Sequence, residues 1–169
     1  PHLLSMEAKL KNNANNENTL ANMSLDSDGF TAHADDLNDP QVSWLWKAGG
    51  TAVSNTDGDI TSSVSANTDA GFSIVSYTGN GTDGDTVGHG LNQAPELMIS
   101  KSRDLSQDWY VFGYPAGPSA FSEDGSNLRL NTAADITNST VHEVSLDASV
   151  ITFVDSGHPN GSSDDRIAY

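Results

Sequence analysis

Aspartate-rich turns are the part of this chain with the clearest capacity for chemistry. They lie at residues 26–29, 57–59 and 83–85, and each pairs aspartate with glycine. Calcium takes about six to eight oxygen ligands, and an EF-hand loop requires Glu at its twelfth position. None of the three turns has Glu at that position. Two interpretations remain: solvated turns closed by local hydrogen bonds, and a looser, weak calcium site shared by Asp57, Asp59, Asp83 and Asp85.

Aromatic rings and one histidine are the candidates for contact with a ligand. Trp109 and Tyr110 follow a polar loop, and Tyr114 precedes a segment of Pro and Gly. Flat apolar rings beside polar groups suit a sugar, but alternation along a strand places at least one of Trp109 and Tyr110 in the core. His89 lies between two glycines, where it could contact a ligand or only start a strand. Core packing therefore competes with ligand binding at each of these four positions.

Catalytic templates are missing from the sequence. The chain has no cysteine, no GxSxG elbow and no HExxH motif. Among 23 acidic residues, some pair of carboxylates will match the spacing of a glycosidase by accident. We therefore expect a protein that is not an enzyme and needs no cofactor, with a polysaccharide depolymerase as the least favoured alternative.

Short strands must position these side chains. Runs of β-branched and aromatic residues recur between turn clusters, and six Asn-Gly or Asp-Gly dipeptides accept the positive φ of tight hairpins. The spacing of Leu3, Met6 and Leu10 leaves one N-terminal helix open. The pattern predicts an all-β fold, an antiparallel β-sandwich of the jelly-roll or lectin-like kind. The expected strands are 42–46, 72–78, 96–101, 109–113, 128–131, 141–146, 150–154 and 166–169.

Charge excludes several classes of partner. The 169 residues carry 7 basic and 23 acidic side chains, a formal net charge of −16. DNA and RNA binding depends on Lys and Arg that replace phosphate counterions, so we expect no nucleic-acid partner. Anionic lipid surfaces repel the chain for the same reason. No apolar stretch approaches the roughly 20 residues of a membrane helix, so we expect no membrane insertion.

An internal repeat divides the chain. Residues 24–31 align without gaps on residues 145–152, at an offset of 121 residues and with four identities. A chance match in a chain rich in Ser and Asp is the alternative. The repeat predicts that residues 1–50 are the C-terminal part of a preceding β unit with its junction, and that residues 51–169 are one complete unit. The numbering would then begin inside a longer polypeptide.

Four segments resemble a known family. Residues 44–58, 71–81, 87–91 and 94–101 are similar to a β-rich domain of tail-fibre and other virion structural proteins of marine bacteriophages. The Trp-Lys-Ala-Gly-Gly junction and the Gly-His-Gly-Leu segment are the most specific parts of the resemblance. Domains of that family often occur in tandem, which agrees with the internal repeat.

The resemblance implies a function. It implies a virion structural protein, a tail- or capsid-fibre domain that assembles by sandwich packing and presents a receptor- or glycan-binding surface. The implied partners are further copies of the chain, as a trimer in a fibre, other virion proteins, and a host surface glycan or receptor. The implied location is the extracellular virus particle. A capsid decoration module with no host ligand is the alternative.

Overall fold

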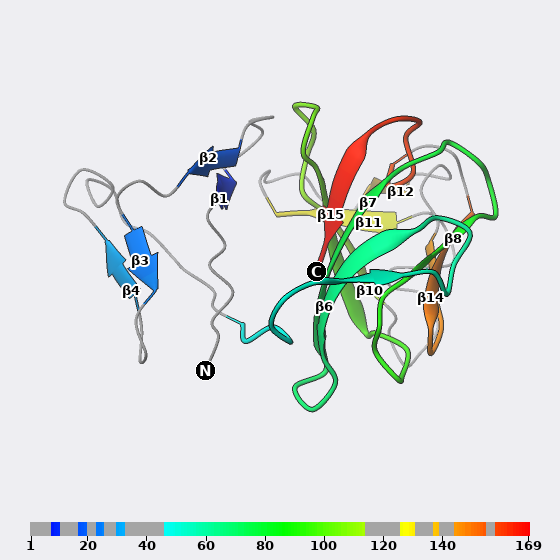
Figure 1. The fold of residues 1–169 in the computed structure, drawn as a ribbon. Helices are drawn as coiled ribbons and strands as arrows, with labels where there is room; N and C mark the ends of the chain where they lie inside the picture. The colour runs from blue at the N-terminus through cyan, green and yellow to red at the C-terminus, as the bar shows by residue number, and fades with distance from the viewer. Residues whose placement is uncertain are drawn as a thin grey trace.

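A computed structural model confirms the all-β antiparallel sandwich (Figure 1). The structure describes residues 8–10, 17–19, 23–25, 30–32, 46–113, 126–130, 137–138, 144–154 and 158–169. Every pairing between its named strands is antiparallel, and one isolated parallel bridge joins Ile60 to Val87.

Eight strands form the larger sheet, in which β15 lies between β7 and β9 although it comes last in the sequence. β7 alternates in burial, with Ser73, Val75 and Tyr77 facing the core, as a strand with one buried face must. In spatial order the sheet contains β12 (Thr137–Asn138), β11 (Ser126–Arg129), β10 (Tyr110–Gly113), β9 (Leu97–Ser102), β15 (Asp165–Ala168), β7 (Phe72–Thr78), β6 (Ser62–Asn67) and β5 (Val53–Asn55).

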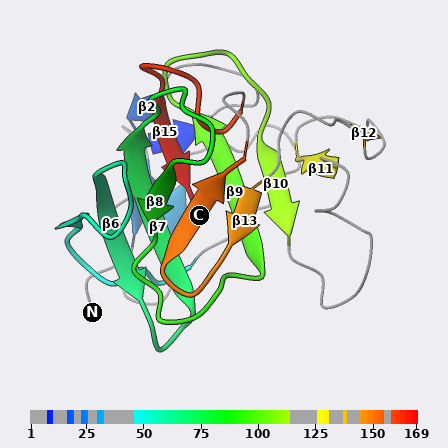
Figure 2. The same cartoon turned by 90° about the vertical axis from the view of Figure 1, so that its right-hand side faces the viewer.

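A smaller sheet covers the middle of the larger one (Figure 2). It contains β13 (Val144–Leu146), β14 (Val150–Phe153) and β8 (Thr86–Gly88), in that order. The Tyr77 and Phe153 rings stack across the two sheets with centroids 5.5 Å apart. The buried apolar core between the sheets consists of Ile60, Val64, Val75, Tyr77, Val87, Met98, Tyr110, Phe112, Ile151, Phe153 and Ala168.

A buried ion pair lies at one end of this core. The Arg166 side chain on β15 is fully buried, and its Nη2 lies 2.5 Å from Oδ2 of the buried Asp164. The Ser102 hydroxyl on β9 donates to the other carboxylate oxygen of Asp164. Arg166 Nη2 also donates to Gln107 Oε1 at 2.8 Å and lies 3.2 Å from His158 Nδ1. The pair thus connects the central strand to its neighbour β9 and to two loops.

Two hairpins precede the sandwich. β1 (Ala8–Leu10) pairs with β2 (Glu17–Thr19), and β3 (Met23–Leu25) pairs with β4 (Phe30–Ala32). Within the described ranges neither hairpin shares a sheet with the sandwich, and Figure 1 shows both beside it. The sequence analysis allowed a helix at the N-terminus. This possibility is wrong for the residues that the structure describes there, because residues 8–10 form a strand.

The sequence located most strands of the sandwich but missed four. The 72–78 segment is β7 at its predicted bounds, and the segments at 96–101, 109–113, 128–131, 141–146, 150–154 and 166–169 overlap β9, β10, β11, β13, β14 and β15. The missed strands are β5, β6, β8 and β12, and the expected strand at 42–46 lies outside the described residues except for Trp46, which is not in a strand. The polar composition of β6, SSVSAN, resembles a turn cluster, and its pairing with β5 and β7 makes it a strand.

Candidate functional site

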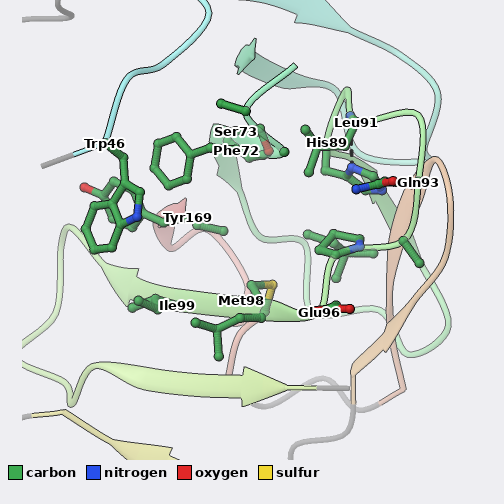
Figure 3. A pocket seen from close by; sticks show the side chains of 18 residues that line it. Trp46, Phe72, Ser73, His89, Leu91, Gln93, Glu96, Met98, Ile99 and Tyr169 are labelled. Atoms are coloured by element: carbon green, nitrogen blue, oxygen red, sulfur yellow. Dashed lines mark hydrogen bonds between the residues drawn. The ribbon is translucent and has the colours of Figure 1, made fainter. Parts of the chain in front are cut away.

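A cleft of about 520 Å³ lies at the end of the larger sheet where β7 and β9 begin and β15 ends (Figure 3). Aromatic rings lie on one side of it, and the loop after β8 lies on the other. Its walls combine apolar side chains with polar groups, and a small-molecule site also contains both kinds. The side chains labelled in Figure 3 are Trp46, Phe72, Ser73, His89, Leu91, Gln93, Glu96, Met98, Ile99 and Tyr169.

A stacked pair of rings forms the exposed side of the cleft. The Trp46 and Phe72 rings are nearly parallel, with an interplanar angle of 10° and centroids 5.6 Å apart. Trp46 is 52% exposed, whereas Phe72 is half-buried at the start of β7. Phe72 therefore supports the Trp46 ring, about half of which remains exposed beside the cleft.

The segment after Trp46 is fixed against β6. Asn67 Nδ2 donates to the Lys47 carbonyl at 3.1 Å, and the Ser65 hydroxyl donates to the Gly50 carbonyl at 2.7 Å. A Cβ on Gly49 would overlap the Ala66 carbonyl, so only glycine allows this approach. The Trp-Lys-Ala-Gly-Gly junction thus has a structural role: it holds Trp46 over Phe72.

Tyr169 extends the aromatic surface. Its backbone exchanges two hydrogen bonds of 2.8 Å with Ile99 on β9. Its ring stacks on Trp109 with centroids 6.5 Å apart. The cleft therefore depends on the correct placement of β15, which carries Tyr169 to the sheet end.

His89 lies on the inner wall of the cleft and is buried. The Leu91 backbone N–H donates to its Nδ1 at 3.1 Å, so Nδ1 must be the unprotonated nitrogen. Its Nε2 lies 3.1 Å from the Asp147 carbonyl, to which it donates. Burial is the main cause that lowers the pKa of His89 below 6.5, while the Asp147 carbonyl opposes the shift.

The glycines beside His89 explain the Gly-His-Gly-Leu segment. A Cβ on Gly88 would overlap the side-chain oxygen of Asn55. Gly90 has φ of +70°, and a Cβ there would lie 2.9 Å from Val64 Cγ1. The segment therefore places the buried imidazole and turns the chain into the loop that borders the cleft.

None of the described ligand-contact residues predicted from sequence belongs to the exposed ring pair. Tyr110 is buried, with its ring 4.9 Å from that of His158, and Trp109 is half-buried against Tyr169. His89 lines the cleft, but both its ring nitrogens are engaged by backbone groups. Tyr114 lies outside the described residues. The Trp46–Phe72 pair was missed, and a Trp before a Gly-Gly junction is the signal that could have indicated it.

The four aspartates considered for calcium lie in the turns after β5 and before β8. Asp57, Asp59 and Asp85 each accept a hydrogen bond from a neighbouring Asn or Thr side chain, at 2.6 to 2.8 Å, and Asp83 is exposed. Across the described part of the chain, no three His, Cys, Asp or Glu side chains gather as a metal would require. The described residues thus form hydrogen-bonded turns and do not assemble the shared calcium site.

The fold and the cleft define a β-sandwich with an aromatic cleft at one sheet end. The model of a family described as a domain of unknown function, DUF7483, matches residues 2–169, and the chain belongs to this family. Neither curated proteins nor solved structures gave a match. Within the described ranges no helix is long and apolar enough to span a membrane.

Protonation of His89 should destabilise the fold. Because its pKa is lowered in the folded chain, the unfolded chain takes up the proton first as pH falls. The contribution of the neutral His89 ring to stability is complete above about pH 6.5. It decreases as the pH falls from there through the lower pKa that His89 has in the folded chain. An NMR titration of the imidazole should show a midpoint below 6.5, with the free energy of unfolding falling over the same interval. A midpoint at or above 6.5 would contradict the buried, neutral assignment.

Proposed function

We propose that this chain is a structural domain of a bacteriophage virion, a tail- or capsid-fibre module that presents the Trp46 cleft to a host glycan or receptor. The observation that carries the proposal is the stacked Trp46–Phe72 pair, which leaves a flat ring exposed on a hydrogen-bonded sheet end. The segments that most resemble tail-fibre domains also build this cleft, since one holds Trp46 and the other supplies His89 and Leu91.

The chemistry of the cleft suits a sugar. An exposed indole offers an apolar face to the C–H side of a pyranose ring, and Gln93 and Glu96 at the border offer hydrogen-bonding groups to its hydroxyls. A site with one principal ring binds weakly by itself. Display of several copies, as in a trimeric fibre, multiplies such weak contacts into strong attachment.

The proposed role is binding without cleavage. Glycosidases act with two carboxylates on opposite sides of the scissile bond. Glu96 is the one acidic side chain among the described residues that line the cleft. The acidic surface, with a net charge of −16, serves solubility in an extracellular particle.

The location of the chain on the particle tests the proposal. An antibody against the purified chain, followed by electron microscopy of the parent phage, should label a fibre. Label on the capsid faces would favour the decoration module with no host ligand. Particles that carry no label and no peptide of the chain by mass spectrometry would refute the virion role.

Removal of the exposed ring tests the binding surface. We expect Trp46→Ala to weaken binding of the chain to host cells or to a host polysaccharide by roughly tenfold, because the stacking face is lost. Leu105→Ala is the matched control, since Leu105 is also exposed, at 48%, and is not a lining residue of the cleft. Equal binding by both variants, with thermal unfolding unchanged, would exclude Trp46 as the contact.

A further inference from the structure

Charge around the Trp46 cleft is of one sign. Glu96 is an exposed lining residue, and among the described residues that line the cleft none is Lys or Arg. The chain as a whole is also acidic, with a net charge of −16. The described walls of the cleft therefore offer a ligand a negative charge and no positive one.

The Glu96 carboxylate has no partner among the described residues. It takes part in neither of the ion pairs there, and its side chain forms no hydrogen bond with the described chain. Its backbone is well placed, because the next residue, Leu97, begins β9 and pairs with Gly113 of β10. A firm strand end thus holds a carboxylate whose oxygens can accept hydrogen bonds from a ligand.

Histidine does not offset this charge. Backbone groups engage both ring nitrogens of His89, each at 3.1 Å, and burial lowers its pKa, so the ring is neutral. Lys47 is exposed and directly follows Trp46, but it is not among the described lining residues. Neither residue places a positive charge on the described walls of the cleft.

Two cations of the larger sheet are buried and engaged elsewhere. Lys101 on β9 donates from Nζ to the carbonyls of Ser102 and Leu105, at 2.7 and 3.1 Å. Arg166 on β15 is paired with Asp164. Neither cation is among the described residues that line the cleft. An anionic sugar would therefore find no partner of opposite charge on these walls.

We propose that the cleft selects a glycan whose sugars carry protonated amino groups and disfavours uronic acids and other anionic sugars. This inference rests on the proposed glycan-binding function and names the chemical class of its ligand. One sugar stacks on the half-exposed Trp46 ring, and another places its ammonium group beside the Glu96 carboxylate. Figure 3 shows these two side chains in different parts of the cleft, so an oligosaccharide is needed to reach both.

The size of the preference follows from the exposure of Glu96. A contact between an ammonium group and an exposed carboxylate is weakened by water and salt, and it changes Kd by about two- to fivefold. An ammonium group over the indole face adds a further attraction of the same sign. A carboxylate on the sugar instead meets repulsion from Glu96 and from the acidic surface.

An NMR titration with three matched sugars tests the selection. The full chain is titrated at low salt and pH 6, below the pKa of an ordinary amino group, with β-1,4-linked hexamers of glucosamine, glucose and glucuronic acid. The three differ mainly in charge, and the shift of the Trp46 indole N–H reports binding at the cleft itself. We expect the glucosamine hexamer to bind about two- to fivefold more tightly than the glucose hexamer, and the glucuronic acid hexamer to bind at least about twofold more weakly.

Two variants separate the effect of Glu96 from that of the net charge. Glu96→Gln should bind the glucosamine and glucose hexamers with similar Kd. Asp83→Ser removes the same unit of charge from an exposed residue outside the cleft lining, and it should keep the preference. Unchanged thermal unfolding of both variants ensures that the comparison concerns binding. A preference that survives Glu96→Gln, or that both variants lose equally, would overturn the proposal.

The titration also distinguishes this proposal from the proposed function. Binding of the glucose hexamer with no preference for glucosamine would refute the charge selection and leave the glycan-binding role in place. Tighter binding of the glucuronic acid hexamer, which Lys47 beside Trp46 would produce, would do the same. If no hexamer moved the Trp46 indole signal, both the charge selection and the glycan-binding role of the cleft would be refuted.

Discussion

The buried pair of Arg166 and Asp164 is the interaction on which the sandwich depends. Both side chains are shielded from water. An unpaired charge in such a buried environment is very costly, so each side chain requires the other. Nε and Nη1 of Arg166 have no hydrogen-bond partner among the described residues, which leaves Nη2 and the Asp164 carboxylate to compensate the charge. Because Arg166 lies on β15, between β7 and β9, this compensation is achieved only when the last strand of the sequence is in the centre of the sheet.

The same constraint links the core to the cleft. Tyr169 directly follows β15, and its backbone pairs with Ile99, so the aromatic end of the sheet forms only with β15 in place. The glycine-containing segments at residues 46–50 and 88–91 then frame the cleft against β6 and Asn55. Burial and backbone contact account for the glycines of these motifs, while Trp46, half-exposed on its stack with Phe72, carries the proposed binding role.

The sequence predicted the fold class and seven of the eleven sandwich strands, because alternation and turn dipeptides are local. β7 has its predicted bounds, but its buried face is Ser73, Val75 and Tyr77, a face that the sequence FSIVSYT does not single out because apolar residues also lie on the other face. The cleft could not be predicted in the same way. The stack of Trp46 on Phe72 depends on how a junction crosses β6, and the spacing of Asp57 and Asp85 along the chain does not fix where their carboxylates point. The repeat is a feature beyond single strands that the sequence did reveal, because the similarity of residues 24–31 to residues 145–152 corresponds to a shared register of two hairpins.

The free energy of unfolding of Asp164→Asn, measured by urea denaturation at pH 7, tests the role of the buried pair most directly. The matched control is Asp108→Asn, which breaks the more exposed ion pair that Asp108 forms with Arg129 at 2.9 Å. We predict a loss of about 3–5 kcal/mol for Asp164→Asn, because it leaves a buried guanidinium charge uncompensated. The control should lose about 0–1 kcal/mol. Similar small losses in both variants would show that the sandwich does not depend on the Arg166–Asp164 pair.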